Sequence, residues 1–191
     1  KFLLWFEPER IVKNKPYITI NKEHPDWVTG IPSSDSQLLN LGNENARTWL
    51  IEHISQLIQK EGIDYYRQDF NFDPFPYWKQ MDAQGRNGIS EIRHIEGLYA
   101  YWDALLERFP NLIIDNCASG GRRIDLETVT RSSPFWRTDY KYGEPIGSQI
   151  HTYGLNFYLP ISGTGSFEMS TYHFRSAMSS HMVTDWDIEN K

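Results

Sequence analysis

Two acidic residues stand in segments whose neighbours could support catalysis. The first is Asp69, in the segment IDYYRQDFN of residues 63–71. Arg67, Asp69 and Asn71 are spaced two residues apart, so on a strand their side chains point to the same side. We interpret Asp69 as a carboxylate nucleophile that Arg67 keeps ionised, with Asn71 binding a ligand. The alternative is an Arg67–Asp69 ion pair that only seals the sheet.

The second acidic residue is Asp139, which ends the β-prone segment PFWRTD. In the predicted strand order it lies two strands from Asp69, or about 10 Å between backbones at about 4.8 Å per strand. Carboxyl groups about 5–5.5 Å apart are typical of retaining glycosidases, and about 6.5–9.5 Å is typical of inverting ones. The sequence spacing does not distinguish a retaining from an inverting mechanism.

The stretch CASGGRR, residues 117–123, follows the apolar run NLIIDN and contains the only cysteine of the chain. Gly120 and Gly121 allow a ligand to approach the backbone closely. Arg123 can donate several hydrogen bonds to ligand oxygens. A plain strand-to-helix turn is the alternative. A phosphate cradle is weaker, because neither GxGxxG nor GxxxxGK[ST] is present.

The histidines and the cysteine do not predict a metal site. A single cysteine excludes an internal disulfide and a cysteine-based zinc site. His53 and His94 fall on predicted helices and are expected to be solvated or satisfied there. His181 and Asp185, four residues apart on the last predicted strand, are a weak metal candidate. We therefore expect no metal and no organic cofactor.

The elements that must position these residues alternate along the chain. Strands are predicted at residues 2–6, 63–70, 111–116, 134–139, 155–161 and 181–188. Helices are predicted at 43–62, 92–109, 146–153 and 171–180, with a short helix or loop at 124–130 and long loops at 13–36 and 71–88. Strands that alternate with helices indicate a parallel sheet with crossover helices.

Polar residues follow nearly every predicted strand, and this separates two parallel-sheet folds. They are Glu7, Asp69, Asn71, Asp115, Asn116, Asp139, Ser162, Asp185 and Asp187. Barrels build their sites from the carboxyl ends of several strands, whereas open sheets concentrate them at one switch point. The pattern favours an α/β fold with part of a (β/α)8 barrel.

Composition excludes some classes of protein. The 191 residues carry a net charge of −6, which offers no basic field for nucleic acid. No apolar stretch is long enough to span a membrane, and the start KFLLWFEPER reads as a strand rather than a signal peptide. Aromatic residues make up 15% of the chain, which fits a sugar-binding cleft or a large aromatic core equally. A cytoplasmic and a periplasmic or secreted location both stay open.

Five motifs in order resemble glycoside hydrolase family 36, the α-galactosidases. They are WFEPE (5–9), HPDW (24–27), QDFN (68–71), CASGGRRID (117–125) and WRTD (136–139). The resemblance implies strands 3 to 8 of a (β/α)8 barrel and retaining hydrolysis of terminal α-galactosides, with Asp69 as nucleophile and Asp139 as general acid/base. It implies substrate-binding or site-shaping roles for Trp27, Arg67, Asn71, Cys117, Gly120, Arg123 and Trp136.

Some positions depart from the family pattern. Arg67 replaces the lysine usual beside the nucleophile, and Phe72 stands where an arginine is frequent. An arginine usual near Asp35 is absent. These departures indicate a divergent branch whose substrate specificity the sequence does not fix.

The resemblance also implies a domain assignment. Residues 1–191 correspond to a fragment of the catalytic barrel, without the family's N-terminal β-domain and first two barrel strands. We expect such a fragment to be inactive alone, and a homo-oligomer is open to it because an incomplete sheet exposes its edge. Three other functions stay open: an α-N-acetylgalactosaminidase, a non-catalytic carbohydrate-binding remnant and a phosphate-binding α/β enzyme.

Overall fold

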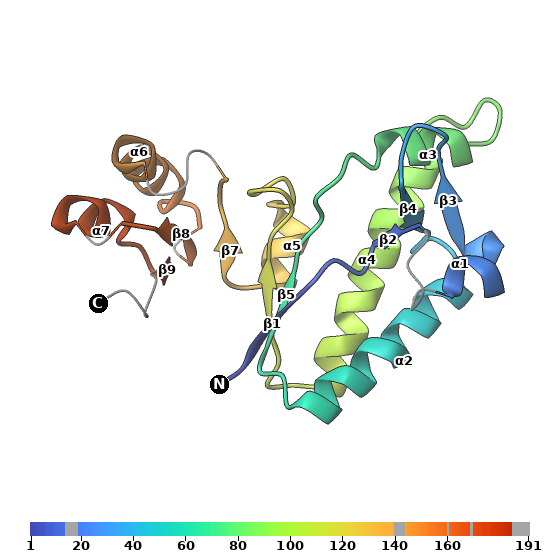
Figure 1. Cartoon of the computed structure of the whole chain (residues 1–191), viewed down its shortest axis with the longest axis horizontal. Coiled ribbons are helices and arrows are strands. Elements are labelled where there is room, and N and C mark those ends of the chain that lie inside the picture. Colours follow the sequence, from blue (N-terminus) through green and yellow to red (C-terminus); the bar gives the residue numbers. More distant parts are fainter. Residues whose placement is uncertain (14–18, 140–143, 160, 169, 185–191) are drawn as a thin grey trace. The chain divides into compact units, whose positions relative to one another are not determined.

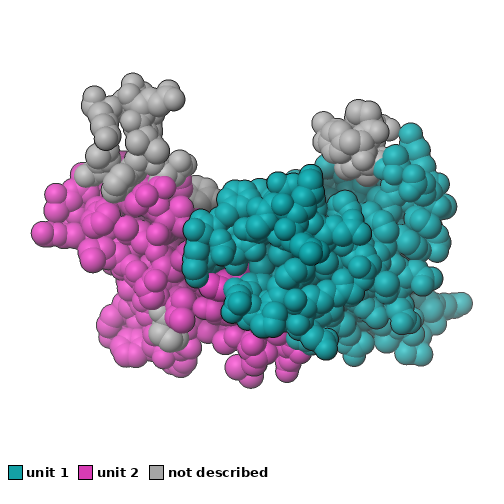
Figure 2. Space-filling model, turned by 90° about the horizontal axis from the view of Figure 1, so that it is seen from below, with its two compact units in different colours: residues 1–112 teal, residues 113–191 magenta. Residues whose placement is uncertain are grey.

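The computed structural model describes residues 1–13, 19–139, 144–159, 161–168 and 170–184. The chain divides into two compact units, Lys1–Leu112 and Ile113–Lys191, which Figure 2 colours teal and magenta. Each unit is described by itself.

A parallel strand pair forms the centre of the first unit. β1 (Leu3–Phe6) pairs with β5 (Tyr65–Gln68), with Trp5 opposite Arg67 and Phe6 opposite Gln68. A parallel pair requires a crossover, and the helix α2 (Glu44–Glu61) lies between the two strands in the chain (Figure 1). The register brings the carboxyl ends of β1 and β5 to the same edge.

The two long helices of this unit follow their predicted patterns. The Asn43 side chain caps α2 by accepting hydrogen bonds from the backbone N–H groups of Asn45 and Ala46, and Gly62 ends the helix in the left-handed conformation. α4 (Ile89–Arg108) packs beside α2. Gly97 of α4 is required for close packing, because a Cβ there would overlap the backbone carbonyl of Leu41. Leu98, Tyr101, Trp102 and Leu105 form the buried face of α4.

A small antiparallel sheet forms around the predicted loop of residues 13–36, with one strand inside the loop and two at its ends. β2 (Arg10–Val12), β4 (Ser36–Leu39) and β3 (Val28–Gly30) pair in that order. The short α1 (Ile20–Glu23) and η1 (Pro25–Trp27) precede β3, and α3 (Phe75–Met81) lies in the predicted turn-rich segment 71–88. The prediction of structureless loops was wrong here, because strands of three or four residues are stabilised by partners distant in sequence.

The second unit contains four parallel strands in the order β6 (Ile113–Asn116), β7 (Phe135–Trp136), β8 (Ser162–Ser166) and β9 (His181–Thr184). The helices α5 (Leu126–Arg131), α6 (Pro145–Leu155) and α7 (Thr171–Ala177) alternate with them. Asp185 and Asp187, predicted at the end of the last strand, lie outside the described residues. In the described part of the chain, no helix is long and apolar enough to cross a membrane.

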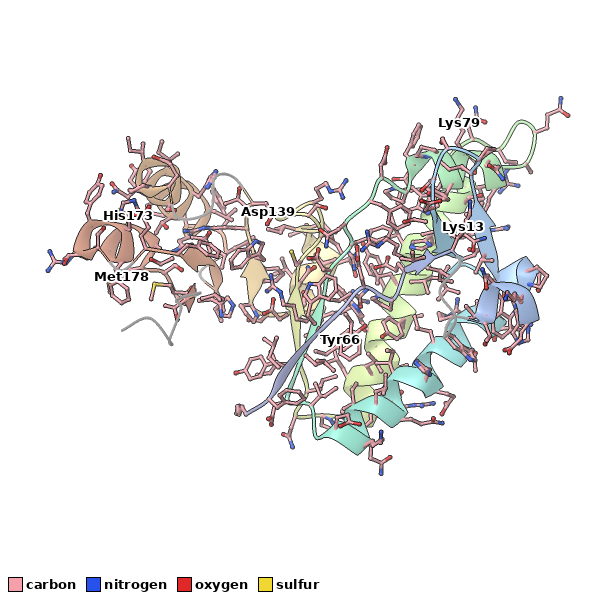
Figure 3. The ribbon with its side chains drawn as sticks, in the orientation of Figure 1. Lys13, Tyr66, Lys79, Asp139, His173 and Met178 are labelled. Carbon is pink, nitrogen blue, oxygen red and sulfur yellow. The ribbon has the colours of Figure 1, made fainter. Side chains whose placement is uncertain are left out.

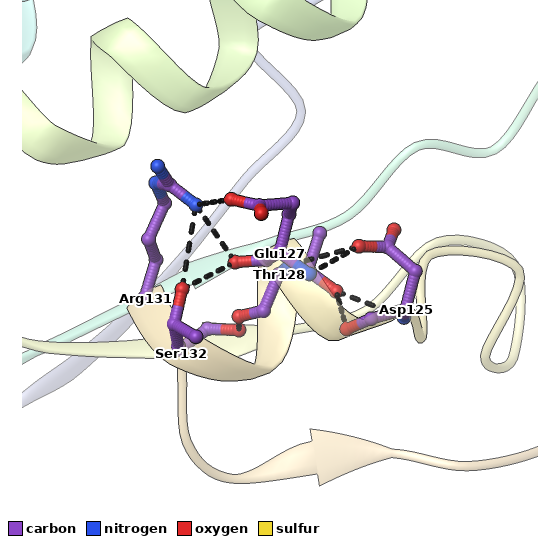
Figure 4. A network of polar contacts seen from close by, with 6 residues as sticks. Asp125, Glu127, Thr128, Arg131 and Ser132 are labelled. Carbon is purple, nitrogen blue, oxygen red and sulfur yellow. Dashed lines mark hydrogen bonds and ion pairs between the residues drawn. The ribbon is translucent and has the colours of Figure 1, made fainter.

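The segment 124–130, predicted as either a short helix or a loop, contains the helix α5, which its own side chains cap. Asp125 accepts hydrogen bonds from the backbone N–H groups of Glu127 and Thr128, both at 2.9 Å, and its own N–H donates to the Thr128 hydroxyl (Figure 4). This reciprocal capping satisfies donors that the first turn would leave unpaired. Arg131 pairs with Glu127 one turn earlier, at 2.7 Å.

The strand predicted at 155–161 is misplaced by several residues. α6 runs through Leu155, and Phe157 and Tyr158 are 77% and 83% exposed. The strand is instead the sequence SGTGS of β8, every residue of which is buried. Gly163 explains the small residues, because a Cβ there would overlap the carbonyl oxygen of His181 on β9. The prediction followed apolar side chains, but close strand packing selected small ones.

Candidate active site

Asp69 lies immediately after β5, beside the end of β1. Its carboxyl group is 8% exposed and accepts a 3.2 Å hydrogen bond from the indole N–H of Trp5 and a 2.7 Å bond from the N–H of Phe70. The Asp69 N–H donates to the carbonyl of Phe6 at 2.8 Å, which extends the strand pairing to this residue. These two hydrogen bonds fix the orientation of the Asp69 carboxyl group at the end of β5.

A second carboxyl group, Glu7, lies at the same strand end. It accepts a hydrogen bond from the N–H of Asn71 and pairs with Arg10. Burial raises the pKa of Glu7 above its ordinary value, against the lowering effects of the Asn71 bond and Arg10, and the negative charge of Asp69 raises it further. Sequence reasoning noted Glu7 only as a polar strand end. Its spacing of two residues from Trp5 is the signal that could have placed it beside Asp69.

Arg67 and Asn71 flank Asp69 as the sequence predicts. Arg67 is half-buried on β5, opposite Trp5 in the strand register. Asn71 is exposed, and Glu7 fixes its backbone. Their roles toward a substrate stay predictions.

Trp5, which is 47% exposed, contacts Asp69 through its indole N–H. Trp27 is buried, with its ring stacked on His24 at 3.7 Å between centroids and 6.4 Å from the ring of Trp49 on α2. The described ring contacts of Trp27 thus belong to the packing of η1 against α2. A sugar-lining role for Trp27 stays a prediction.

Asp139 lies three residues after Trp136 of β7, in the second unit (Figure 3). Its carboxyl group is half-buried and accepts a 2.8 Å hydrogen bond from the indole N–H of Trp136. The predicted partners Trp136 and Asp139 are therefore in direct contact. The indole leaves one carboxyl oxygen, Oδ2, outside this bond.

The stretch CASGGRR packs against the segment that carries Asp139. Gly120 has a φ of 75°, and a Cβ on it would lie 2.9 Å from the Asp139 Cγ and closer still to its backbone nitrogen. Gly121 has a φ of 97°, and its Cβ would lie 2.5 Å from the carbonyl oxygen of Arg137. Both glycines are required by their backbone angles and by the neighbouring chain. The close approach predicted for a ligand is therefore made by residues 137–139.

Cys117 and Arg123 lie at the two ends of this stretch. Cys117 is buried, and Arg123 is 9% exposed. The carbonyl of Arg123 accepts hydrogen bonds from the Asn116 side chain at 2.9 Å and the Thr128 hydroxyl at 2.8 Å. These bonds tie the end of the loop to β6 and α5.

His181, which the sequence pairs with Asp185 as a weak metal candidate, lies near a different acidic residue, Asp115. Its Nε2 is 3.7 Å from Oδ2 of Asp115 on β6, which is fully buried. Its predicted partner Asp185 is outside the described residues. Among the residues that the structure describes, no group of three or more histidine, cysteine, aspartate or glutamate side chains is placed to hold a metal ion.

The sequence patterns did not predict a role for Arg137, which lies within the motif WRTD and holds neighbouring elements together. It is buried and donates a 2.7 Å hydrogen bond to the Thr152 hydroxyl of α6. Burial lowers the pKa of Arg137, and burial together with the charge of Arg137 lowers the pKa of His151. Arg137 thus fixes α6 to the segment that carries Asp139.

Parallel strands that alternate with helices, with acidic side chains after β5 and β7, define the class of α/β proteins in which barrel glycosidases fall. The chain belongs to the Melibiase family, whose model matches residues 1–177.

Individual relatives agree with this assignment. The alpha-galactosidase Mel36A of Lactobacillus acidophilus is 28% identical over 145 residues, which cover 73% of this chain and 19% of the relative. An alpha-galactosidase of Escherichia coli is 30% identical over 146 residues, with coverage of 73% and 19%. The chain thus spans about a fifth of the length of these curated relatives.

A solved structure shows the fold. A variant of the GH36 alpha-galactosidase AgaA from Geobacillus stearothermophilus, in complex with stachyose, matches with a TM-score of 0.82 at 22% identity, over 100% of this chain and 28% of that chain. The predicted fold class, α/β with part of a (β/α)8 barrel, is confirmed.

Proposed function

We propose that this chain carries the catalytic carboxylates of a retaining glycoside hydrolase that removes terminal α-galactosyl residues. One observation carries the proposal: Asp69 and Asp139 each follow a parallel strand and each accepts the indole N–H of a tryptophan. The donor to Asp69 is Trp5 of the motif WFEPE, and the donor to Asp139 is Trp136 of the motif WRTD. Family membership and the names of the alpha-galactosidase relatives support this choice of reaction.

The substrate class follows from the same relatives. Solved structures of AgaA variants are complexes with stachyose and with raffinose. We infer that the sugar recognised here is a terminal α-galactosyl group of an oligosaccharide or glycoconjugate. The polar groups beside Asp69, from Arg67 and Asn71, and the loop around Gly120 and Arg123, are the proposed contacts for its hydroxyls.

The proposed reaction has two displacement steps. Asp69 attacks the anomeric carbon while the bond to the leaving oxygen breaks, and Asp139 gives that oxygen its proton. The product is a glycosyl ester of Asp69. Water then attacks the same carbon, Asp139 takes the proton of the water, and the Asp69 carboxylate is released. Two inversions return the original configuration.

Two substitutions in the complete protein test these roles. Asp69→Ala should abolish hydrolysis of an aryl α-galactoside, because no glycosyl ester can form. Asp139→Ala should lower kcat/KM by about 10²–10⁴-fold for a substrate whose leaving group needs protonation. Turnover by Asp69→Ala at the wild-type rate would contradict the assignment.

Azide gives a stereochemical check on the same two variants. With Asp139→Ala, azide should intercept the glycosyl ester and yield the α-galactosyl azide, because the sugar has been inverted twice. With Asp69→Ala, any azide product should be the β-anomer, formed by a single inversion. The reverse pattern would exchange the two roles. If the wild type hydrolyses only an aryl α-N-acetylgalactosaminide, the α-N-acetylgalactosaminidase function is favoured. If it binds saccharides without turnover, the non-catalytic carbohydrate-binding function is favoured.

A further inference from the structure

The side chain of Gln68 is held at both ends inside the first unit. Gln68 is fully buried on β5, directly before Asp69. Its Nε2 donates to Oε2 of Glu9 at 2.8 Å, and its Oε1 accepts from the indole N–H of Trp102 on α4 at 2.7 Å. A donor at one end and an acceptor at the other fix the orientation of the amide.

Glu9 connects this amide to two further elements. It is 1% exposed, and its Oε1 lies 3.1 Å from Nε2 of His94 on α4, which is equally buried. The backbone carbonyl of Glu9 accepts from the N–H of Leu39 on β4 at 2.9 Å. Glu9, Gln68, His94 and Trp102 are called the buried polar cluster below.

Besides the backbone bond from Asp69 to Phe6, three of the described side-chain hydrogen bonds link the segment 5–9 to the segment 68–71. Trp5 donates to Asp69, and Glu7 accepts from the N–H of Asn71. The third link, from Glu9 to Gln68, belongs to the opposite side of β5, since neighbouring residues of a strand point to opposite faces. The backbone around Asp69 is therefore held on both faces.

We propose that Gln68, held by Glu9 and Trp102, is a positioning residue that fixes the backbone from which Asp69 reaches the substrate. The inference rests on the proposed function, in which Asp69 is the nucleophile. A nucleophile displaced by about 1 Å can lose about 10²-fold in rate, so a rigid support behind it has a catalytic effect. Buried polar clusters are costly compared with apolar packing, and they select one arrangement of the chain rather than maximise stability.

The competing explanation is that the buried polar cluster only stabilises the core. A matched control separates the two explanations. The hydroxyl groups of Tyr66 and Tyr101 are 2.7 Å apart, and both residues are fully buried. This pair also joins β5 to α4, but from two residues before Gln68 (Figure 3 labels Tyr66). Tyr101→Phe therefore removes a buried hydrogen bond between the same two elements and keeps both hydrogen bonds of the Gln68 amide.

The test compares Gln68→Met with Tyr101→Phe in the complete protein, using an aryl α-galactoside at a temperature where both variants are folded. Methionine keeps the length of the side chain but cannot replace the two hydrogen bonds. We expect Gln68→Met to lower kcat/KM at least tenfold, with the inhibition constant of galactose changed less than twofold. Tyr101→Phe should lower the melting temperature and keep kcat/KM within twofold.

Trp102→Phe is the second variant, because it removes the indole N–H donated to Gln68 and leaves the Gln68 side chain itself unchanged. We expect a smaller loss of kcat/KM in the same direction, and this variant decides the question if Gln68→Met does not fold. Equal kcat/KM for the cluster variants and Tyr101→Phe would overturn the inference, as would a loss confined to galactose binding. A wild-type protein without turnover would instead overturn the proposed function.

Discussion

At the scale of the residue, the proposed nucleophile shares its strand end with a second acid. Glu7 and Asp69 lie close enough that the charge of Asp69 raises the pKa of Glu7, and burial raises it more. Arg10 and the N–H of Asn71 compensate only in part. The two carboxyl groups have different hydrogen-bond donors: Glu7 accepts from the backbone N–H of Asn71, whereas Asp69 accepts from the indole of Trp5 and the backbone N–H of Phe70.

The pH dependence of stability tests this description of Glu7. A carboxyl group whose pKa is raised in the folded state favours folding below its unfolded-state pKa, near 4.5, and this contribution is lost as the pH rises through the folded-state pKa. Glu7→Gln should therefore gain stability relative to wild type as the pH rises from below 4.5, and the difference should level off above the raised pKa.

The measurement is the free energy of unfolding in urea at several pH values. Glu127→Gln, on the exposed helix α5, is the control for removing one negative charge. A loss of stability of Glu7→Gln relative to wild type as the pH rises would contradict the raised pKa.

At the scale of the element, glycines decide where chains can pack. Gly120 and Gly121 bring the CASGGRR stretch onto the backbone of residues 137–139, and Gly163 lets β9 lie directly beside β8. None of these positions carries an apolar side chain that would mark it as core. The physical signal is the absence of a Cβ where two backbones meet.

Gly163→Ala should destabilise the chain by at least about 3 kcal/mol, because its Cβ overlaps the His181 carbonyl and backbone cannot yield as a side chain does. Gly154, in α6, is the matched control: nothing lies within 4 Å of a Cβ there. Gly154→Ala should stabilise by about 0.5–1 kcal/mol, since alanine loses less entropy in a helix. Urea unfolding measures both, and similar effects of the two changes would refute the packing argument.

At the scale of the whole molecule, the chain is about a fifth of the length of the curated relatives it matches. The proposed activity is therefore tested on the complete protein. The active site of a (β/α)8 barrel is built from the carboxyl ends of several of its eight strands. The described residues of this chain form six parallel strands.

Residues 1–191 produced alone should show no turnover of an aryl α-galactoside, because a site that lacks part of its strand ends cannot hold the sugar in register with Asp69. The assay is run beside the complete protein at equal molar concentration. Size-exclusion chromatography with light scattering reports whether the isolated segment associates. Turnover by residues 1–191 at a rate comparable with the complete protein would contradict the expectation.

The amino-acid sequence was enough to predict the alternation of strands and helices, the caps of α2, and the motifs that place Asp69 and Asp139 after strands. These features depend on local periodicity and on residues adjacent in the chain, such as Asn43 and Gly62. The same local patterns supported the fold class and the choice of both candidate carboxylates.

Three features could not be predicted from the sequence: the contact of Trp5 with Asp69, the position of β8, and the buried polar cluster. Trp5 and Asp69 are 64 residues apart, and Glu9 and His94 are 85 apart, so no local pattern links them. β8 contains no apolar side chains from which a strand could be predicted. Its position depends on the close packing of Gly163 against the backbone of His181. Contacts of this kind depend on the packing of distant elements, which periodicity within one segment does not encode.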